Sequence, residues 1–306
     1  MIVGHAALAF AVVAYASNRF GLSRERALTL ALVAAGFAVV PDVDMAYAVV
    51  GTVQSGATGV WSATDAFWGS SQAVHRLATH SLVVAIPAIL AFGLVTRDRL
   101  GQLTAGVILV GVVILGGLAS GPLAAATLVL FAIGGVLVAT IASRAGLGTR
   151  AVLATAGVGL LLHPFGDVFT GTSPLLLYPV DLRVLPPRVA LHPDPTVNLL
   201  AVFGLELATI WLAVGAASTL EIIDLPSSLD PRGAIGAGYA LAVFVLPPPT
   251  LDVSYHFVFS ILAVGTVGIV PISRPFDRAD LATAAITALL AVTLGGFGYA
   301  VTYLVA

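Results

Sequence analysis

Long runs of apolar residues, separated by short polar stretches, fill almost the whole chain. Ten of these runs are predicted as helices, near residues 2–17, 27–41, 77–96, 101–120, 122–142, 151–170, 198–220, 233–247, 254–272 and 281–304. A helix needs roughly 20 apolar residues to cross a hydrocarbon core about 30 Å thick. We therefore predict an all-α fold, a polytopic transmembrane helix bundle of about 8–10 spans, in which the short segments are half-inserted helices packed inside the bundle.

Breaks in the apolar pattern mark the connections between helices. The uncharged stretch from Leu100 to Ser143 is too long for one crossing, and Gly121-Pro122 divides it into a predicted helical hairpin. Residues 42–76 are predicted as one long outer loop and the proline-rich residues 171–197 as another. Loops of this length usually cover or build a site.

Composition excludes several classes of protein. Of the 306 residues, 59% are hydrophobic and 9% are charged, whereas a soluble domain has about 25% charged residues, so the chain is not a water-soluble globule. The net charge is −2 and every basic residue is an arginine, which leaves no basic stripe for nucleic acid. Without cysteine, a metal ion must be held by His, Asp or Glu.

The arginines predict the orientation, because cytoplasmic loops collect positive charge. If the connection near Arg24 is cytoplasmic, alternation of the spans places ten arginines inside and three outside. The inside group is Arg19, Arg24, Arg26, Arg97, Arg99, Arg144, Arg150, Arg232, Arg274 and Arg278, and the outside group is Arg76, Arg183 and Arg188. This arrangement puts the N-terminus outside and all six histidines at the extracytoplasmic face, where ionisable groups beside the bilayer are candidate functional residues. The first helix lacks a basic n-region and is expected to be retained rather than cleaved.

Two motifs carry much of the candidate chemistry. His163 and Asp167 lie four residues apart, so one helix face presents both, either to a metal ion or to each other as a hydrogen-bonded pair. His75 and His80 can face one site only if His75 precedes the helix. Thr79 or Ser81 would then cap that helix. The planar guanidinium of Arg76 would either bind a phosphate or be solvated.

Two further elements complete the candidate set. Asp42 and Asp44, in Pro41-Asp42-Val43-Asp44, either contribute to a metal site or form a solvated turn that ends a helix. His5 is either a ligand or a lone polar residue in a helix contact. Because all these groups are expected at one membrane face, a metal centre is the favoured interpretation. His192, Asp194 and Glu206 are reserve candidates.

The order of these motifs resembles the YdjM-like family of membrane-bound metal-dependent hydrolases, which are also described as LexA-binding and inner-membrane-associated. That pattern is an early His, Pro-Asp-x-Asp, His-Arg-x-x-Thr-His-Ser and a later His-x-x-x-Asp, followed here by Thr170-Gly171 and Tyr178-Pro179. The resemblance covers about residues 1–206, outside the insert at 45–74 and the last spans. More distantly, the ligand pattern is similar to that of the zinc-dependent phospholipase C superfamily.

Together these features predict a membrane-embedded hydrolase-like domain at 1–220 and a C-terminal transmembrane helical extension at 221–306. The expected function is hydrolysis of a phosphoester, such as a lipid phosphoester, by a metal-activated water at the outer face of the cell membrane. Zinc suits the ligand types best, with manganese as an alternative and one or more ions bound. The expected metal ligands are His5, Asp42, His75, His80, His163 and Asp167, with Asp44 and Arg76 in catalytic roles.

The expected partners are membrane lipid and a small-molecule or lipid substrate, with no nucleic acid. Two alternatives to the hydrolase stay open. One is a transporter that uses His and Asp for ion or proton coupling, and the other is a non-catalytic membrane scaffold for a regulatory partner.

Overall fold

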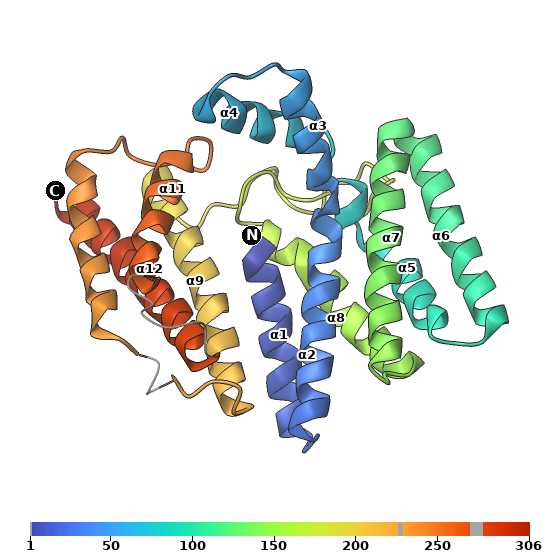
Figure 1. Cartoon of the computed structure of the whole chain (residues 1–306). Coiled ribbons are helices and arrows are strands. Elements are labelled where there is room, and N and C mark those ends of the chain that lie inside the picture. Colours follow the sequence, from blue (N-terminus) through green and yellow to red (C-terminus); the bar gives the residue numbers. More distant parts are fainter. Residues whose placement is uncertain (1, 226–228, 270–277) are drawn as a thin grey trace. The chain divides into compact units, whose positions relative to one another are not determined.

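A computed structural model describes residues 2–225, 229–269 and 278–306, and in these ranges the chain is helical, without strands (Figure 1). It divides into two compact units, Met1–Val189 and Ala190–Ala306. Within the described ranges, five helical stretches are long and apolar enough to cross a membrane: Arg24–Gln54, Arg99–Ser120, Pro122–Arg144, Pro195–Thr219 and Leu281–Val305. The predicted all-α membrane bundle is confirmed. Arg274 and the end of the predicted 254–272 segment lie outside the described residues.

Six helices form the bundle of the first unit. They are α1 (Ile2–Arg19), α2 (Arg24–Val39), α5 (Leu82–Val95), α6 (Arg99–Ser120), α7 (Pro122–Arg144) and α8 (Thr149–Asp167). Helix α2 packs against α1, α7 and α8, and α5 packs against α6, α7 and α8. The predicted hairpin is confirmed, because α6 and α7 are joined by Gly121 alone, with φ of +84°. That left-handed conformation favours glycine.

Aromatic rings and close helix contacts build the core of this unit. Phe37 of α2, Phe92 of α5 and Phe131 of α7 are fully buried, and their ring centroids follow one another at 5.7 and 6.0 Å. Helix α8 approaches α2 closely at Gly159, where an added Cβ would lie 2.7 Å from the backbone nitrogen of Ala38. The position of α8 relative to α2 is therefore fixed by backbone contact.

The segment predicted as one long outer loop, residues 42–76, contains helices, and that prediction is wrong. The 3₁₀ helix η1 (Val40–Met45) continues α2 directly into α3 (Ala46–Gln54), and α4 (Val60–Ser71) folds back on α3. Apolar residues 46–53 extend the helix beyond the Pro-Asp turn, and Gly51 admits Ser70 of α4 at close range. The 3₁₀ turn η2 (Ala78–His80) then leads into α5.

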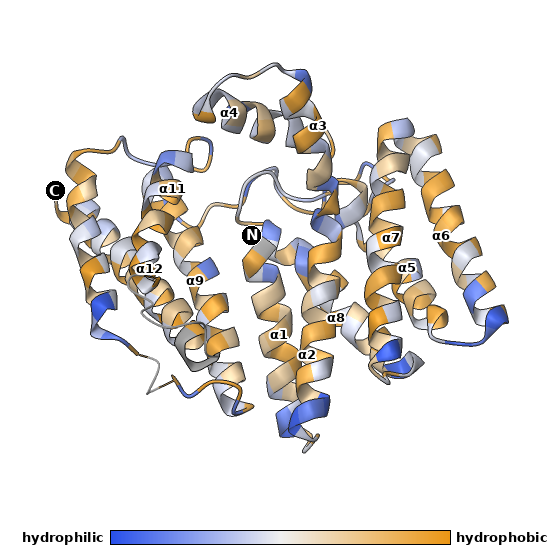
Figure 2. Cartoon of the chain, in the orientation of Figure 1, coloured by the Kyte–Doolittle hydropathy of each residue, from blue (hydrophilic) through white to orange (hydrophobic). Residues whose placement is uncertain are grey.

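The two ends of the first unit differ in chemistry. The connections α1–α2, α5–α6 and α7–α8 lie at one end of the bundle, and the N-terminus and the α3–α4 hairpin lie at the other (Figure 1). Figure 2 shows hydrophilic residues concentrated at those three connections. Seven arginines belong to them: Arg19, Arg24, Arg26, Arg97, Arg99, Arg144 and Arg150.

The second unit has its own core. Its elements are α9 (Pro195–Thr219), η3 (Pro231–Phe244), α11 (Tyr255–Val264), η4 (Gly265–Gly268) and α12 (Arg278–Val305). Tyr239, Phe257 and Tyr299 pack together there, with Phe257 and Tyr299 buried. Helix α9 lies in this unit, and the division between the two compact units falls between residues 189 and 190. The functional assignment of the two predicted domains stays a prediction.

Candidate metal centre

Helix α2 and its continuation bring two carboxylates into the first unit. Pro41 stands at the start of η1, and the tight turn that follows directs Asp42 and Asp44 inward, where they are 7% and 0% exposed. Helix α8 supplies His163 and Asp167 from its last turns, both 1% exposed. Because these two residues are four apart on a helix, they share one face.

The connection from α4 to α5 supplies the remaining groups. Arg76 has φ of +67°, which bends the chain between His75 and η2. His80 ends η2 and is fully buried. Ser81 then caps α5, accepting hydrogen bonds from the backbone nitrogens of Val83 and Val84 at 3.1 and 3.4 Å. His75 precedes the helix as required, and Ser81 rather than Thr79 is the cap.

Four of the predicted ligands have donor atoms at the mutual distances of a metal coordination shell. His80 Nε2 lies 3.0 Å from His163 Nε2 and 3.1 Å from Asp167 Oδ2. Asp42 Oδ1 lies 3.6 Å from His80 Nε2 and 3.5 Å from His163 Nε2. Asp167 Oδ2 lies 3.7 Å from His163 Nε2. Ligands bonded to zinc at 2.0–2.2 Å in a tetrahedron are separated by about 3.3–3.6 Å. The five distances above lie around this range, and the donor atoms of all four residues lie within 4.8 Å of one another, so the group could hold one cation.

The hydrogen bonds of the two Nδ1 atoms indicate which ring nitrogen of His80 and of His163 faces the centre. His163 Nδ1 donates a hydrogen bond to the carbonyl of Ala38 at 2.7 Å, which leaves Nε2 as an acceptor. Thr79 donates its single hydroxyl proton to Asp44 Oδ2 at 2.7 Å, so toward His80 Nδ1, at 2.9 Å, it accepts. In its neutral form, His80 therefore also presents an unprotonated Nε2. Two lone pairs facing each other at 3.0 Å require a proton or a cation between them.

Charge and unsatisfied oxygens support a cation at this point. Asp42 Oδ2 and Asp167 Oδ2 are buried and have no hydrogen-bond partner among the described residues, and buried carboxylate oxygens are normally satisfied. His80 lies between α4 and α5, outside the candidate spans. Burial lowers its pKa, but the surrounding carboxylates outweigh burial and raise the pKa of His80 to about 10. The same negative potential would stabilise a divalent cation.

The other predicted site residues border the four. His5 of α1 donates from Nε2 to Asp167 Oδ1 at 3.0 Å, and His75 donates from Nδ1 to Asp44 Oδ1 at 3.1 Å. Asp44, His75 and His80 form a second group with donor atoms within 4.8 Å of one another. The structure thus brings together every residue of the predicted set, while direct ligation by His5 and His75 stays a prediction.

Arg76 lies at the same centre, where its guanidinium already contacts neighbouring protein groups. Its terminal nitrogens donate to the carbonyl of Thr172 at 2.9 Å and to the hydroxyl of Thr170 at 2.5 Å. Its Nε lies 3.6 Å from Asp167 Oδ2. This geometry ties Arg76 to the 170–172 segment and to a metal-facing carboxylate, while its predicted contact with a substrate phosphate stays a prediction.

Two contacts of the centre were not identified from the sequence. The carbonyl of Ala38 carries no side-chain signal, and the role of Thr170 in holding Arg76 depends on distant parts of the chain meeting. The reserve candidates His192, Asp194 and Glu206 belong to the second unit. There Asp194 caps α9, accepting from the backbone nitrogens of Thr196 and Val197.

Replacing Thr79 with valine is expected to weaken metal binding about 10- to 100-fold, the usual effect of losing an outer partner of a ligating histidine. Valine keeps the shape but removes the hydroxyl that connects Asp44 with His80. Isothermal titration with zinc measures the change. Thr155→Val is the matched control, because Thr155 is equally buried and donates only within α8. Equal affinities of the two variants would contradict the assigned role of Thr79.

Comparison with known proteins agrees with the order of the motifs. Residues 1–226 match the model of the YdjM inner membrane protein family. No curated protein and no solved structure matches the chain. The matched part covers the whole first unit, including every residue of the centre and the apolar helices around it. This multi-pass membrane chain belongs to the YdjM inner membrane protein family.

Proposed function

We propose that this chain is an integral-membrane, metal-dependent hydrolase that cleaves phosphoesters at the extracytoplasmic membrane surface. The observation that carries the proposal is the pair of Nε2 atoms of His80 and His163, which face each other 3.0 Å apart beside two carboxylates with unsatisfied oxygens. The Nδ1 atoms of both rings are also bonded, that of His163 to the carbonyl of Ala38 and that of His80 to the hydroxyl of Thr79, and these hydrogen bonds fix the orientation of the two imidazoles. The arrangement is suited to holding a divalent cation, which would take the place of the proton between the two nitrogens.

Each residue of the centre has a distinct part in the proposed reaction. His80, His163, Asp42 and Asp167 would hold the ion, and two imidazoles with two carboxylates favour zinc, with manganese as the alternative. A bound divalent ion supplies an acidified water and polarises a phosphoryl oxygen. Asp44 and Thr79 keep His80 in its ligating tautomer, and Arg76 holds Asp167 in place. His5 holds the second oxygen of that same carboxylate.

The depth of the centre supports chemistry on membrane lipids. Its residues come from the end of the bundle opposite to the arginine-bearing connections (Figure 1). By the positive-inside rule those connections are cytoplasmic, so the centre lies at the extracytoplasmic headgroup region. Transporters more often bind their substrates near the bilayer midplane. A lipid phosphoester reaches a site at headgroup depth by lateral diffusion.

The proposed side of the membrane can be tested with single cysteines, since the chain has none. Thr58→Cys lies in the α3–α4 connection, at the end of the first unit opposite to the α7–α8 connection that holds Ala145→Cys, and both positions are exposed. A membrane-impermeant maleimide is expected to label Thr58→Cys in intact cells and Ala145→Cys only after permeabilisation. The reverse pattern would place the centre on the cytoplasmic side.

Hydrolysis itself is tested with the full chain purified in detergent. We expect cleavage of a soluble aryl phosphodiester, loss of the activity with a chelator, and its return with zinc or manganese. One specific observation favours a second function: four protein donors already complete a tetrahedral shell, as in structural zinc sites. A protein that retains its metal but cleaves neither soluble nor lipid phosphoesters would support that structural role and overturn the hydrolase proposal.

A further inference from the structure

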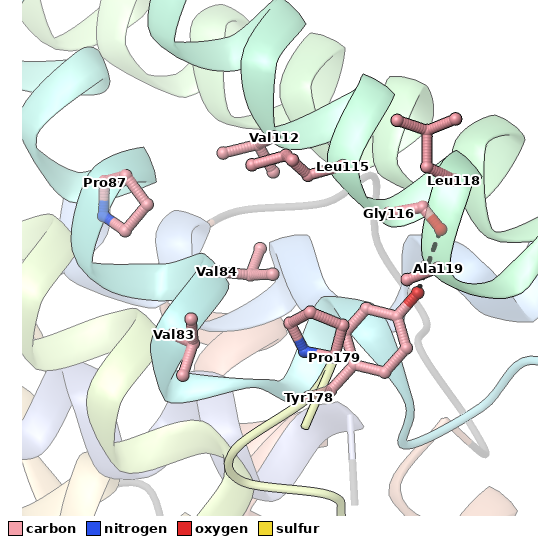
Figure 3. A pocket seen from close by; sticks show the side chains of 10 residues that line it. All are labelled: Val83, Val84, Pro87, Val112, Leu115, Gly116, Leu118, Ala119, Tyr178 and Pro179. Carbon is pink, nitrogen blue, oxygen red and sulfur yellow. Dashed lines mark hydrogen bonds between the residues drawn. The ribbon is translucent and has the colours of Figure 1, made fainter. Parts of the chain in front are cut away.

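An apolar groove lies between α5 and α6, close to the metal centre. It has a volume of about 560 Å³. Figure 3 shows Val83, Val84 and Pro87 of α5 facing Val112 and Leu115 of α6 across it, with Tyr178 at one end. Leu115 and Leu118 are 64% and 81% exposed, so the groove opens toward the outside of the bundle.

A single residue connects this groove with the metal centre. Ser81 follows His80 directly and accepts hydrogen bonds from the backbone nitrogens of Val83 and Val84. The hydroxyl of Ser81 also donates to the carbonyl of Tyr178 at 2.8 Å. The Cα atoms of His80 and Val83 are separated by three chain steps, hence by at most about 11 Å. The groove therefore begins beside the centre.

The direction and depth of the groove suit a hydrocarbon chain. Its lining on α6 runs from Val112 to Ala119, which is about 10 Å along the helix axis at 1.5 Å per residue. This distance lies well within one leaflet of a hydrocarbon core about 30 Å thick. The hydroxyl of Tyr178, the polar group at this wall, is already bonded to the carbonyl of Gly116 at 3.1 Å. The surface that remains for a ligand is thus almost entirely apolar.

We infer that this groove binds one acyl chain of the lipid whose phosphoester lies at the metal centre. The position of the headgroup rests on the proposed function, whereas the position of the acyl chain rests on the groove itself. Within the bilayer, acyl chains are the bulk apolar component, so they are the apolar ligand that a groove opening toward the outside of the bundle meets. The substrate class is accordingly a phospholipid rather than a soluble phosphate ester.

Photolabelling tests the groove without relying on activity. The probe is phosphatidylglycerol with a diazirine in one acyl chain, added to the full chain in lipid nanodiscs. We expect saturable labelling of residues 83–87 and 112–119, competed by unlabelled phosphatidylglycerol. Ala119→Trp, at an exposed position on the groove wall, should reduce this labelling, whereas Val107→Trp, exposed on α6 outside the groove, should not. Uniform, non-saturable labelling of α6 in all three proteins would overturn the inference.

A kinetic comparison separates the groove from the metal centre. Ala119→Trp should lower kcat/KM for a long-chain phospholipid by about tenfold, the lower end of the discrimination that an apolar pocket provides, and leave hydrolysis of a soluble aryl phosphodiester and metal content unchanged. Equal loss on both substrates would overturn the acyl-chain role. If the wild-type chain cleaves neither substrate, the proposed function fails, and the labelling result alone still decides whether the groove binds an acyl chain.

Discussion

His163→Ala is expected to abolish tight metal binding and to lower phosphodiester hydrolysis by more than about 100-fold, which exceeds the usual effect of losing an outer-shell partner. The imidazole of His163 is buried, and its Nε2 faces His80 and both carboxylates. Without it, the remaining donors form an incomplete shell, and the carbonyl of Ala38 loses its hydrogen bond. Elemental analysis of the purified protein measures the metal content, and the aryl phosphodiester assay measures the activity.

The matched control for this loss is His192→Ala. His192 is exposed in the second unit and accepts a hydrogen bond from the backbone nitrogen of Asp194. It should retain metal and activity at the wild-type level. Asp42→Asn provides a second, nearly isosteric variant, which separates loss of a ligand charge from loss of packing. Full metal content in both His163→Ala and Asp42→Asn would contradict the assigned ligands.

A single methyl group at Gly159 is expected to have a large effect on both stability and metal binding, although Gly159 is not a ligand. The Cβ of Gly159→Ala would lie 2.7–2.8 Å from the backbone nitrogen of Ala38, the carbonyl oxygen of Ala34 and the Cβ of Phe37. Backbone atoms cannot move aside as a side chain can, so α8 must shift away from α2. Overpacking of this kind costs about 1–3 kcal/mol, and the shift would also separate Asp42 from His163.

Gly157→Ala is the control on the same helix, because an added Cβ there meets no described atom within 4 Å. Alanine is more favourable than glycine in a helix by about 0.8–1 kcal/mol, so the control should be as stable as the wild type or more so. Thermal unfolding in detergent and zinc titration measure both effects. We expect a lower Tm and at least about tenfold weaker zinc binding for Gly159→Ala alone. Matching behaviour of the two variants would contradict the close α2–α8 contact as the positioning element.

Much of the architecture could be predicted from the apolar runs and from the glycine and proline residues that separate them. The hairpin at Gly121-Pro122 follows from the length of an uncharged stretch that exceeds one crossing and from the proline that starts a new helix. Helices α3 and α4 do not follow from this pattern, because their short, partly polar sequences lack the length of a span. Their pairing depends on the contact of Gly51 with Ser70, which no local pattern reveals.

The candidate centre could be predicted as a set of residues but not as a geometry. Spacing placed His163 and Asp167 on one face, and the arginine bias placed the histidines at one end of the bundle. The sequence could not distinguish the four donors that converge from His5 and His75, which contact carboxylates of the cluster. That difference depends on the approach of α1 and of the His75–His80 connection to α2 and α8. The tautomers likewise follow from Ala38 and Thr79, which become visible only after folding.

X-ray absorption at the metal edge of the purified chain tests the central claim most directly. The chain has no cysteine, so the account predicts a spectrum of nitrogen and oxygen ligands near 2.0–2.2 Å, with the multiple-scattering signal of two imidazoles. That imidazole signal should weaken in His163→Ala. A spectrum without imidazole scattering, or a chain that takes up no zinc or manganese at saturating concentration, would contradict it.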